Sequence, residues 1–547
     1  MLVPGRHYLL HKIGDTFAAQ LMNSISLIIF VIIVLCVFII RIIPPILWGK
    51  RALYRGDTMV HRLIIEKSKK NNHCVPNFED QFLLTDSETY PTFYHQLLSF
   101  LSLETIAKIE PFIGAFLETL QAIFVFMASC KLAEVYWPTV NSFYAASLTT
   151  IMFGITPLLF ENPARIFHMS ERPFGVLMAT VSLSGVITSL LINSTGMIIF
   201  SAIFVALTLL SSKFGAQALL FLSVGIAILV IDLRPLIILI SGVGIALLIS
   251  RFHYWDILRG HIHHSYLYKT YLADRNPATT VFNLKQLLLW PKTFVRSPVE
   301  AIRMLVTHYM LISFSLFAWV FPLAVSYLGW PQWLGGRVEK LLIIWVLAGF
   351  TAMMLTATQA FRFLGEPHRY VIYSVAPVCA ITAFRLLSIN HPVLWLVAAM
   401  ALFVSIAGSA VAYVNFIKGE NRDENIPAIY EFIAKLEPQR ILTIDLRLSY
   451  VLSYRTSHQV VCPFTNFPGG SKLSQLKQLV PKWWPYPDLD LTKIIKDHQV
   501  NLLIVDQNKL DFIKKIDPTY AYDFSNMQPI FEYASFIVYD VTKSRDD

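Results

Sequence analysis

The sequence is poor in charged residues. Only 15% of its 547 residues are Asp, Glu, Lys or Arg, whereas an average soluble protein carries about 25%. The hydrophobic fraction is 55% and the mean hydropathy is +0.55. A soluble chain of this size could not keep so much apolar surface out of water. Long runs without charge, each of about 18 residues or more, have the length that crosses a hydrocarbon core of about 30 Å. The sequence therefore predicts a polytopic integral membrane protein.

Cysteine is also scarce. The chain holds five cysteines, and neither a Cys-x-x-Cys pair nor a Cys/His cluster with metal-ligand spacing occurs. This absence argues against a zinc site built on a local cysteine motif. The interpretation we favour is that these cysteines are small buried residues. A disulfide between Cys74 and Cys462 would require both segments to face an oxidising compartment.

Two further absences concern the ends of the chain. The first apolar run begins near Ser24 and continues to about Arg41. It is too long for the core of a signal peptide and lacks a small-residue cleavage site, so we expect a retained first helix. In the C-terminal part, no glycine-rich phosphate loop follows either strand-like run that ends in Asp, which argues against a nucleotide site. The net charge of +9 lies mostly in connections. It points to anionic headgroups or phosphate-bearing substrates before nucleic acid.

The hydropathy pattern predicts about eleven transmembrane helices followed by a small C-terminal α/β soluble domain. The expected spans are 24–47, 113–133, 139–160, 174–192, 195–211, 216–232, 235–250, 307–329, 341–359, 370–388 and 393–416. The segment 216–250 has an alternative interpretation as one re-entrant hairpin that turns at residues 232–235. We therefore divide the chain into a membrane module, 1–416, with a long first loop at 48–112, and a soluble domain, 417–547.

The connections between the spans alternate in character. Long or polar connections follow spans one, three, seven, nine and eleven, and the even-numbered connections are short. The informative polar segments therefore lie on one face, as an enzyme that works at a single membrane surface requires. Lysine and arginine counts alone would place this face in the cytoplasm, but the positive-inside rule is weak for long segments.

The C-terminal part alternates strand-like and helix-like patterns. Apolar runs at 440–445, 500–506 and 536–539 read as strands, and segments such as 426–436 and 491–498 have helical periodicity. This alternation is typical of an α/β domain. We do not expect a catalytic site there.

The first loop begins with a candidate acid. From Asp57 onward the pattern predicts a helix, which puts Asp57 and His61 on one helical face at i, i+4. A carboxylate at a helix N-terminus is stabilised by the helix dipole, so a simple helix cap is the alternative interpretation of Asp57.

The connection 161–173 combines two acids, two arginines and a histidine beside strongly apolar helices. Long side chains that reach the membrane surface would explain the arginines but not the adjacent Glu171 and Arg172 at the membrane edge. Ionisable groups in this position are costly and are candidates for function. The candidates in this connection are Arg165, His168, Glu171 and Arg172.

The connection that precedes span ten carries a second candidate group. Arg369 lies at the start of that span, where a guanidinium could hold a phosphate with two hydrogen bonds. A charge that only anchors the helix at the membrane surface is the alternative. The candidates in this connection are Glu366, His368, Arg369 and Tyr370.

In their order along the chain, these segments resemble the GT-C class of glycosyltransferases, which take a sugar from a polyprenyl-phosphate or polyprenyl-diphosphate carrier. The matching features are an Asp soon after the first span, a Tyr-Pro…His stretch at 90–95, the acid/Arg connection at 161–173 and the Glu-x-x-Arg-Tyr motif at 366–370. The resemblance implies that Asp57 is the base, and that the regions of Glu171 and Arg369 support it. It also implies that the catalytic loops face the periplasm or the ER lumen.

The sequence departs from the class in two respects. Thr58 follows Asp57 where many members have a second acid. The Trp-Trp-Asp-Tyr-Gly signature of oligosaccharyltransferases is absent, which argues against bulk transfer to asparagine.

From this resemblance we expect an inverting glycosyltransferase, with Asp57 and Glu171 as catalytic candidates. His61, Arg165, His168, Arg172, Glu366, His368, Arg369 and Tyr370 are candidates for binding substrate or phosphate. The expected partners are a polyprenyl-phosphate-linked sugar donor, membrane lipids and an acceptor glycan, lipid or protein, without nucleic acid. A divalent cation such as Mg²⁺ or Mn²⁺ is possible, although no ligand set can be identified. The expected location is the bacterial inner membrane with the catalytic face in the periplasm, and the ER membrane is the second choice.

Two other function classes use the same kind of scaffold. A lipid or sugar transporter or flippase would carry ionisable residues in the middle of its spans and functional groups on both faces. A non-catalytic scaffold subunit of the same architecture would explain the missing second acid. The histidines at 261, 263 and 264 could bind metal, but no carboxylate completes a site within their cluster, so we expect a surface that contacts water or headgroups.

Overall fold

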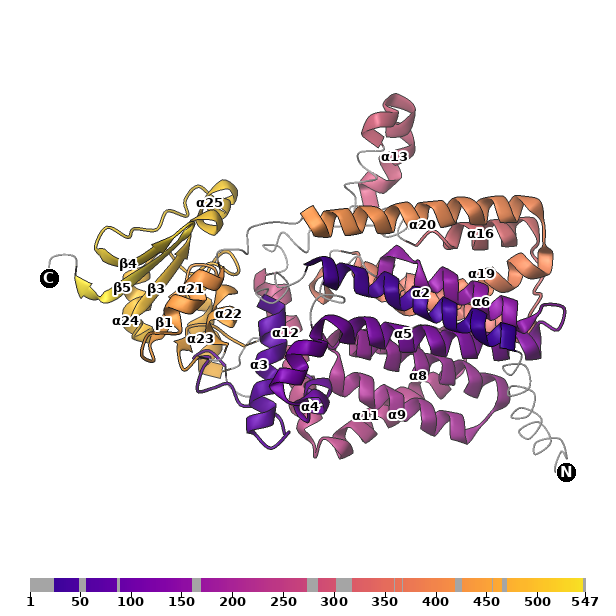
Figure 1. The fold of residues 1–547 in the computed structure, drawn as a ribbon, viewed down its shortest axis with the longest axis horizontal. Coiled ribbons are helices and arrows are strands. Elements are labelled where there is room, and N and C mark those ends of the chain that lie inside the picture. The colour runs from indigo at the N-terminus through magenta and orange to yellow at the C-terminus, as the bar shows by residue number, and fades with distance from the viewer. Residues whose placement is uncertain are drawn as a thin grey trace.

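The computed structural model describes residues 24–48, 56–85, 89–159, 169–272, 284–301, 317–358, 360–365, 367–418, 426–454, 456–464 and 470–544. Long helices lie side by side in a bundle, and a small sheet lies beyond one end of it (Figure 1).

Each expected span contains a helix of the bundle. Seven described helices are long and apolar enough to cross a membrane, and three shorter apolar helices lie among them. The chain is an integral membrane protein; the count of eleven spans stays a prediction. The bundle helices are α2 (Ser24–Trp48), α5 (Leu103–Tyr136), α6 (Ser142–Gly154), α8 (Arg172–Ile192), α9 (Thr195–Ser211), α10 (Lys213–Val230), α11 (Arg234–Ile249), α16 (Val320–Gly329), α17 (Gly336–Thr356), α19 (Val375–Ile389) and α20 (Pro392–Lys418).

The segment 216–250 forms two helices joined by a tight turn. Helix α10 ends where Ile231 adopts a left-handed conformation with φ of 57°. The carboxylate of Asp232 then accepts a hydrogen bond of 2.9 Å from the backbone N–H of Arg234, the first residue of α11. The Arg234 guanidinium donates to the carbonyl oxygen of Ser189 at 2.8 Å, which ties this turn to the end of α8.

Small residues allow the bundle helices to approach closely. A Cβ at Gly242 of α11 would collide with Val205 of α9, and one at Gly185 of α8 would collide with Ser201 of α9. Small residues at such crossings let helix backbones approach, which strengthens their van der Waals packing in the membrane.

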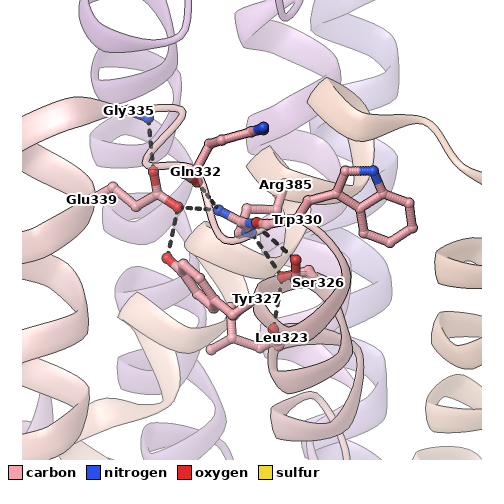
Figure 2. Close-up of polar contacts among 8 residues, drawn as sticks. All are labelled: Leu323, Ser326, Tyr327, Trp330, Gln332, Gly335, Glu339 and Arg385. Carbon is pink, nitrogen blue, oxygen red and sulfur yellow. Dashed lines mark hydrogen bonds and ion pairs between the residues drawn. The ribbon is translucent and has the colours of Figure 1, made fainter.

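A buried ion pair joins Arg385 of α19 to Glu339 of α17, and both side chains are 0% exposed. The guanidinium Nη1 lies 2.6 Å from the Glu339 carboxylate, and Glu339 also accepts from the Tyr327 hydroxyl at 2.6 Å. The guanidinium also donates hydrogen bonds to Ser326, Trp330 and Gln332. The Glu339 carboxylate accepts one more from the backbone N–H of Gly335, and Figure 2 shows these contacts. The network satisfies both charges and fixes the connection between α16 and α17.

Several short helices gather with the sheet at one end of the bundle (Figure 1). Most of them belong to the odd-numbered connections, as the alternation of the connections predicts, whereas residues 370–374 lie inside the expected span 370–388. They include α3 (Gly56–Lys70), α4 (Phe93–Ser99), α12 (His253–Leu267), the π-helical turn η3 (Tyr268–Leu272), α18 (His368–Val371) and the 3₁₀ turns η5 (Arg362–Leu364) and η6 (Ile372–Ser374). The 3₁₀ turn η2 (Pro157–Leu159) follows α6, and α13 (Leu284–Arg296) projects sideways from the bundle.

Helix α3 is anchored to the bundle by charge. The Arg62 guanidinium donates to the buried Glu110 carboxylate of α5, with its Nε at 2.7 Å. Breaking a buried pair by removing one partner typically costs about 3–5 kcal/mol. This contact therefore holds the helix that carries Asp57 and His61 against the first part of α5.

The C-terminal part folds around a five-stranded sheet of order β2-β1-β3-β5-β4. Strand β1 is parallel to β2 and β3, and β5 is antiparallel to β3 and β4. The strands are β1 (Arg440–Thr443), β2 (Gln459–Val460), β3 (Leu502–Asp506), β4 (Met527–Tyr533) and β5 (Phe536–Ser544), with helices α21 (Ile426–Ile433), α22 (Leu448–Ser453), α23 (Gly470–Leu479), α24 (Leu491–His498) and α25 (Gln507–Ile516). The expected small α/β region is present.

The first loop shares a hydrophobic core with this sheet region. Apolar side chains of α3 and of residues 78–84 are buried together with those of β1, β3 and β5. Phe82 forms a bridge with Val460, and the backbone N–H of Val460 donates to the carbonyl oxygen of Gln81 at 2.8 Å. The division of the chain at residue 416 stays a prediction, since this core joins residues from both sides of it.

Candidate functional site

Three buried side chains from separate segments meet at the sheet end of the bundle. His61 lies on α3, His95 lies on α4, and Glu171 directly precedes α8. One possible ligand atom from each lies within 4.8 Å of the other two. His61 Nδ1 and His95 Nε2 are 2.9 Å apart, and His61 Nε2 is 3.8 Å from a Glu171 carboxylate oxygen. We call these residues the His–His–Glu group.

The surroundings of the His–His–Glu group favour metal binding. Burial, and secondarily the neighbouring His61, hold the pKa of His95 well below its usual range. A neutral imidazole with a free lone pair is the form that binds a metal. His95 Nδ1 is buried without a hydrogen-bond partner in the described chain. The Tyr90 hydroxyl donates to Glu171 at 2.9 Å and orients its carboxylate.

The position of Asp57 relative to this group follows from the helix. Asp57 is the second residue of α3, one helical turn before His61. Residues at i and i+4 lie on the same helical face, so Asp57 and His61 occupy one face of α3. The side chain of Asp57 lies outside the described residues, and its role as base stays a prediction.

A second group, made of cations, surrounds Phe214 at the start of α10. The guanidinium carbons of Arg172 and Arg369 lie 5.1 Å and 4.5 Å from the centre of the Phe214 ring. Two cations on one aromatic ring are held partly by cation–π attraction. Lys213 directly precedes Phe214 at the start of α10 and is the third basic residue of this region. We call Arg172, Lys213 and Arg369 the cation group.

Two members of the cation group, Arg172 and Lys213, have donor atoms without a partner among the described residues. Lys213 is partly buried and has no hydrogen bond or ion pair with any described residue. One guanidinium nitrogen of Arg172, Nη1, is buried and likewise has no hydrogen-bond partner in the described chain. Burying a positive group without a partner is costly, so these atoms are placed to receive an anion.

Helix α12 adds two neutral histidines beside Lys213. Burial, followed by the charge of Lys213, lowers the pKa of His261 to about 3. The pKa of His264 is held well below its usual range by the same two causes in the same order, with the neighbouring His261 and His263 contributing further. His261 Nε2 is buried and unpaired among the described residues. An anion bound to Lys213 would therefore meet neutral imidazoles rather than competing carboxylates.

Three helix N-termini converge on the cation group. Arg172 and Lys213 are the first residues of α8 and α10, and Arg369 is the second residue of α18, where the span 368–389 begins. The Tyr370 hydroxyl lies 3.3 Å from the Gln217 side-chain oxygen, which joins two of these ends. The N-terminus of a helix carries a partial positive charge and unpaired N–H groups that favour phosphate.

The two groups adjoin each other at the consecutive residues Glu171 and Arg172. One side of this pair offers a carboxylate and imidazoles that suit a divalent cation. The other side offers two guanidiniums over one aromatic ring, with Lys213 next to that ring residue in the chain, and such basic groups suit a phosphate. Together they can bind a phosphate ester and stabilise the negative charge that develops when its C–O bond breaks.

The structure brings some of the sequence candidates together and leaves others aside. His61 and Glu171 meet in the His–His–Glu group, and Arg172 and Arg369 meet in the cation group. His368 and Tyr370 are buried beside Arg369. Arg165, His168 and Glu366 lie outside the described residues, so their roles stay predictions.

Sequence reasoning missed four residues of this region. His95 was visible in the Tyr-Pro…His stretch, but no pattern linked it to His61 across 34 residues. Lys213 and Phe214 lie in the short connection between spans five and six, which has the same parity as the long connections. Because odd-numbered connections are expected on the same face of the membrane, this parity could have placed Lys213 and Phe214 on the face that carries the other candidates. His261 was noted only as part of a histidine cluster, and the metal-like group in the described chain does not include it.

Comparisons with known proteins identify the fold. No protein-family model and no curated protein sequence matches the chain. The oligosaccharyltransferase of Archaeoglobus fulgidus, in complex with Zn and sulfate, superposes with a TM-score of 0.54 at 13% identity, over 94% of this chain and 73% of that one. The same enzyme, AglB, in complex with an inhibitory peptide and a dolichol-phosphate gives 0.51 at 12% identity, over 90% and 71%. ArnT from Cupriavidus metallidurans bound to undecaprenyl phosphate gives 0.47 at 13% identity, over 93% and 97%. The chain has the fold of GT-C glycosyltransferases, as the resemblance predicts.

Proposed function

We propose that this protein is a glycosyltransferase that moves a sugar from a polyprenyl-phosphate or polyprenyl-diphosphate carrier to an acceptor at one face of the membrane. The observation that carries the proposal is that the His–His–Glu group and the cation group adjoin at the consecutive residues Glu171 and Arg172, where an apolar helix begins. The GT-C fold supports it, and so do the dolichol-phosphate, zinc and sulfate in the AglB structures.

The cation group is the site for the carrier phosphate. Lys213 and Arg172 offer hydrogen-bond donors that no described residue uses, and Arg369 adds a guanidinium over the same aromatic ring. The isoprenoid tail would then lie along the apolar helices that begin at these residues. A hydrogen bond to a charged group contributes about 1.5–3 kcal/mol, so the loss of any one donor weakens carrier binding.

The His–His–Glu group is the site for a divalent cation. Two imidazoles and one carboxylate are the donor set of many zinc sites and also suit manganese. Magnesium, which prefers oxygen ligands and retains several waters, fits this set poorly. A bound cation would supply Lewis-acid stabilisation of negative charge near the carrier phosphate.

The transfer itself needs a base and a stabilised leaving group. Asp57 accepts the proton of the acceptor hydroxyl as that oxygen attacks the anomeric carbon. The bond from this carbon to the carrier phosphate oxygen breaks, and the configuration inverts. The negative charge passes to the carrier phosphate, where Lys213, Arg172 and Arg369 stabilise it. A positioned base contributes a factor of about 10²–10⁴ to the rate.

We place this site on the periplasmic face of a bacterial inner membrane, with the ER lumen as the second choice. The acceptor is a glycan, a lipid or a protein. A topology reporter placed near residue 57 and a second one fused after residue 547 should then both respond outside the cytoplasm. A cytoplasmic response at either position would contradict the placement.

The decisive experiment for the proposal measures sugar transfer by the purified full chain. Undecaprenyl-phosphate and dolichyl-phosphate sugars serve as donors, and membrane extracts of the native host provide the acceptor. Asp57→Asn should lower transfer by at least about 100-fold while carrier binding persists, because the amide cannot take the proton.

The matched control is Asp80→Asn in the same first loop. The Asp80 side chain is 70% exposed and pairs with Lys67 at 3.1 Å. Since such surface pairs contribute about 0–1 kcal/mol, transfer should stay near normal. Near-normal transfer by Asp57→Asn would fit a helix cap and would move the base elsewhere. If every donor fails although the carrier binds, the transporter and scaffold alternatives replace the proposal.

A further inference from the structure

Helix α13 is amphipathic, with its basic residues on one side. At 3.6 residues per turn, Lys285, Lys292 and Arg296 fall within about 40° of one another around the helix axis. The segment 284–296 contains no acid, so these residues give it a net charge of +3.

The other side of α13 is apolar. The sequence places six side chains on an arc of about 120°, and Trp290 borders this arc. They are Leu284, Leu287, Leu288, Pro291, Phe294 and Val295. Leu289 departs from the segregation, since it lies toward the basic side. A helix with Lys and Arg on one face and Trp, Phe and Leu on the other is the kind that lies in a membrane interface.

The structure leaves the described part of this apolar side exposed. Val295 is 84% exposed and Phe294 is 43% exposed. Figure 1 shows α13 standing out from the bundle, with its axis drawn across the direction of the bundle helices. Because the bundle helices span the membrane, a helix that crosses them at a steep angle lies along the membrane plane.

We propose that α13 is a membrane-surface helix. Its apolar side enters the boundary between headgroups and acyl chains, and Lys285, Lys292 and Arg296 contact anionic headgroups. The orientation of the helix, its apolar side and its net positive charge all match a bilayer surface with negative lipids. This inference is independent of the proposed transfer reaction.

The test uses nitroxide labels on the full chain in vesicles of phosphatidylcholine with about one-third phosphatidylglycerol. The native cysteines are first replaced by serine or alanine, and the background is retained only if its thermal unfolding matches that of the original chain. Val295→Cys labels the apolar side, and Thr293→Cys, two residues away on the other side, is the matched position. A water-soluble nickel chelate should relax the label at 295 several-fold less than the label at 293.

Equal accessibility at the two positions would overturn the proposal, because the helix would then stand in water. A separate variant tests whether the positive charges of α13 are needed. In it, Lys285, Lys292 and Arg296 are replaced by Gln. In anionic vesicles this variant should lose much of the protection at 295, and raised salt should act on the original chain in the same direction. Protection that survives both changes would contradict the role of anionic headgroups.

Discussion

Lys213 offers a sharp test of the carrier site. Its ammonium has no hydrogen-bond or ion-pair partner among the described residues, and Lys213 directly precedes Phe214, whose ring Arg172 and Arg369 share. Lys213→Met keeps much of the apolar stem but removes the charge. A lost hydrogen bond to a charged group costs about 1.5–3 kcal/mol. At about 1.4 kcal/mol per factor of ten, affinity for the carrier should fall about 10- to 150-fold.

The assay measures binding of radiolabelled undecaprenyl phosphate to the purified full chain in nanodiscs. Undecaprenol, which has the same tail without the phosphate, should bind the original chain and Lys213→Met equally. The matched variant is Lys340→Met, because Lys340 also lies near the start of a span but stacks on Trp333, 5.5 Å from the ring centre. Unchanged binding by Lys213→Met, or an equal loss in Lys340→Met, would refute the assignment of the phosphate to Lys213.

Four further predictions follow from particular contacts. His95→Ala should abolish stoichiometric Mn²⁺ or Zn²⁺ binding, measured by elemental analysis after dialysis, whereas His73→Ala in the same loop should retain it; metal retained by His95→Ala would exclude the His–His–Glu site. Arg385→Met should lower the free energy of unfolding by about 3–5 kcal/mol, because it leaves the carboxylate of Figure 2 buried and uncompensated; an unchanged unfolding temperature in detergent would contradict this. Phe82→Ala should cost about 3–5 kcal/mol and make the sheet region more sensitive to protease, and undiminished resistance would argue against the shared core. Folding lowers the pKa of His261 from its ordinary value of 6.5 to about 3. The folded protein is therefore fully stable with respect to this group above about pH 6.5, and it loses up to about 1.4 kcal/mol of stability per pH unit below that value. In a pH series of thermal unfolding, His261→Gln should reduce this loss of stability per pH unit.

Much of the fold could be predicted from the sequence because the membrane imposes a strong pattern. An apolar run must form a helix when no water is present to satisfy its backbone, so each expected span contains a helix. Strands β1, β3 and β5 were equally visible as short apolar runs with turn residues around them. The two-residue strand β2 and the exposed strand β4 carry no comparable pattern.

The candidate site was only partly predictable, because its residues come from distant segments. Glu171 and Arg172 were noticeable as charges at a membrane edge, and Arg369 as a charge at the start of a span. Which residues contact these three depends on how the ends of the helices pack against one another. His95 joins His61 only through the packing of α4 against α3, and Phe214 meets Arg172 only through the packing of α8 against α10. The shared core between the first loop and the sheet was hidden for the same reason.

The central claim is tested most directly by a structure of the full chain, in nanodiscs, with undecaprenyl phosphate bound. The account predicts phosphate density in contact with Lys213, Arg172 and Arg369, and beside the His–His–Glu group. The tail density should run from there along the bundle helices. Phosphate density at another position, such as the opposite end of the bundle near Arg385 and Glu339, would contradict the account.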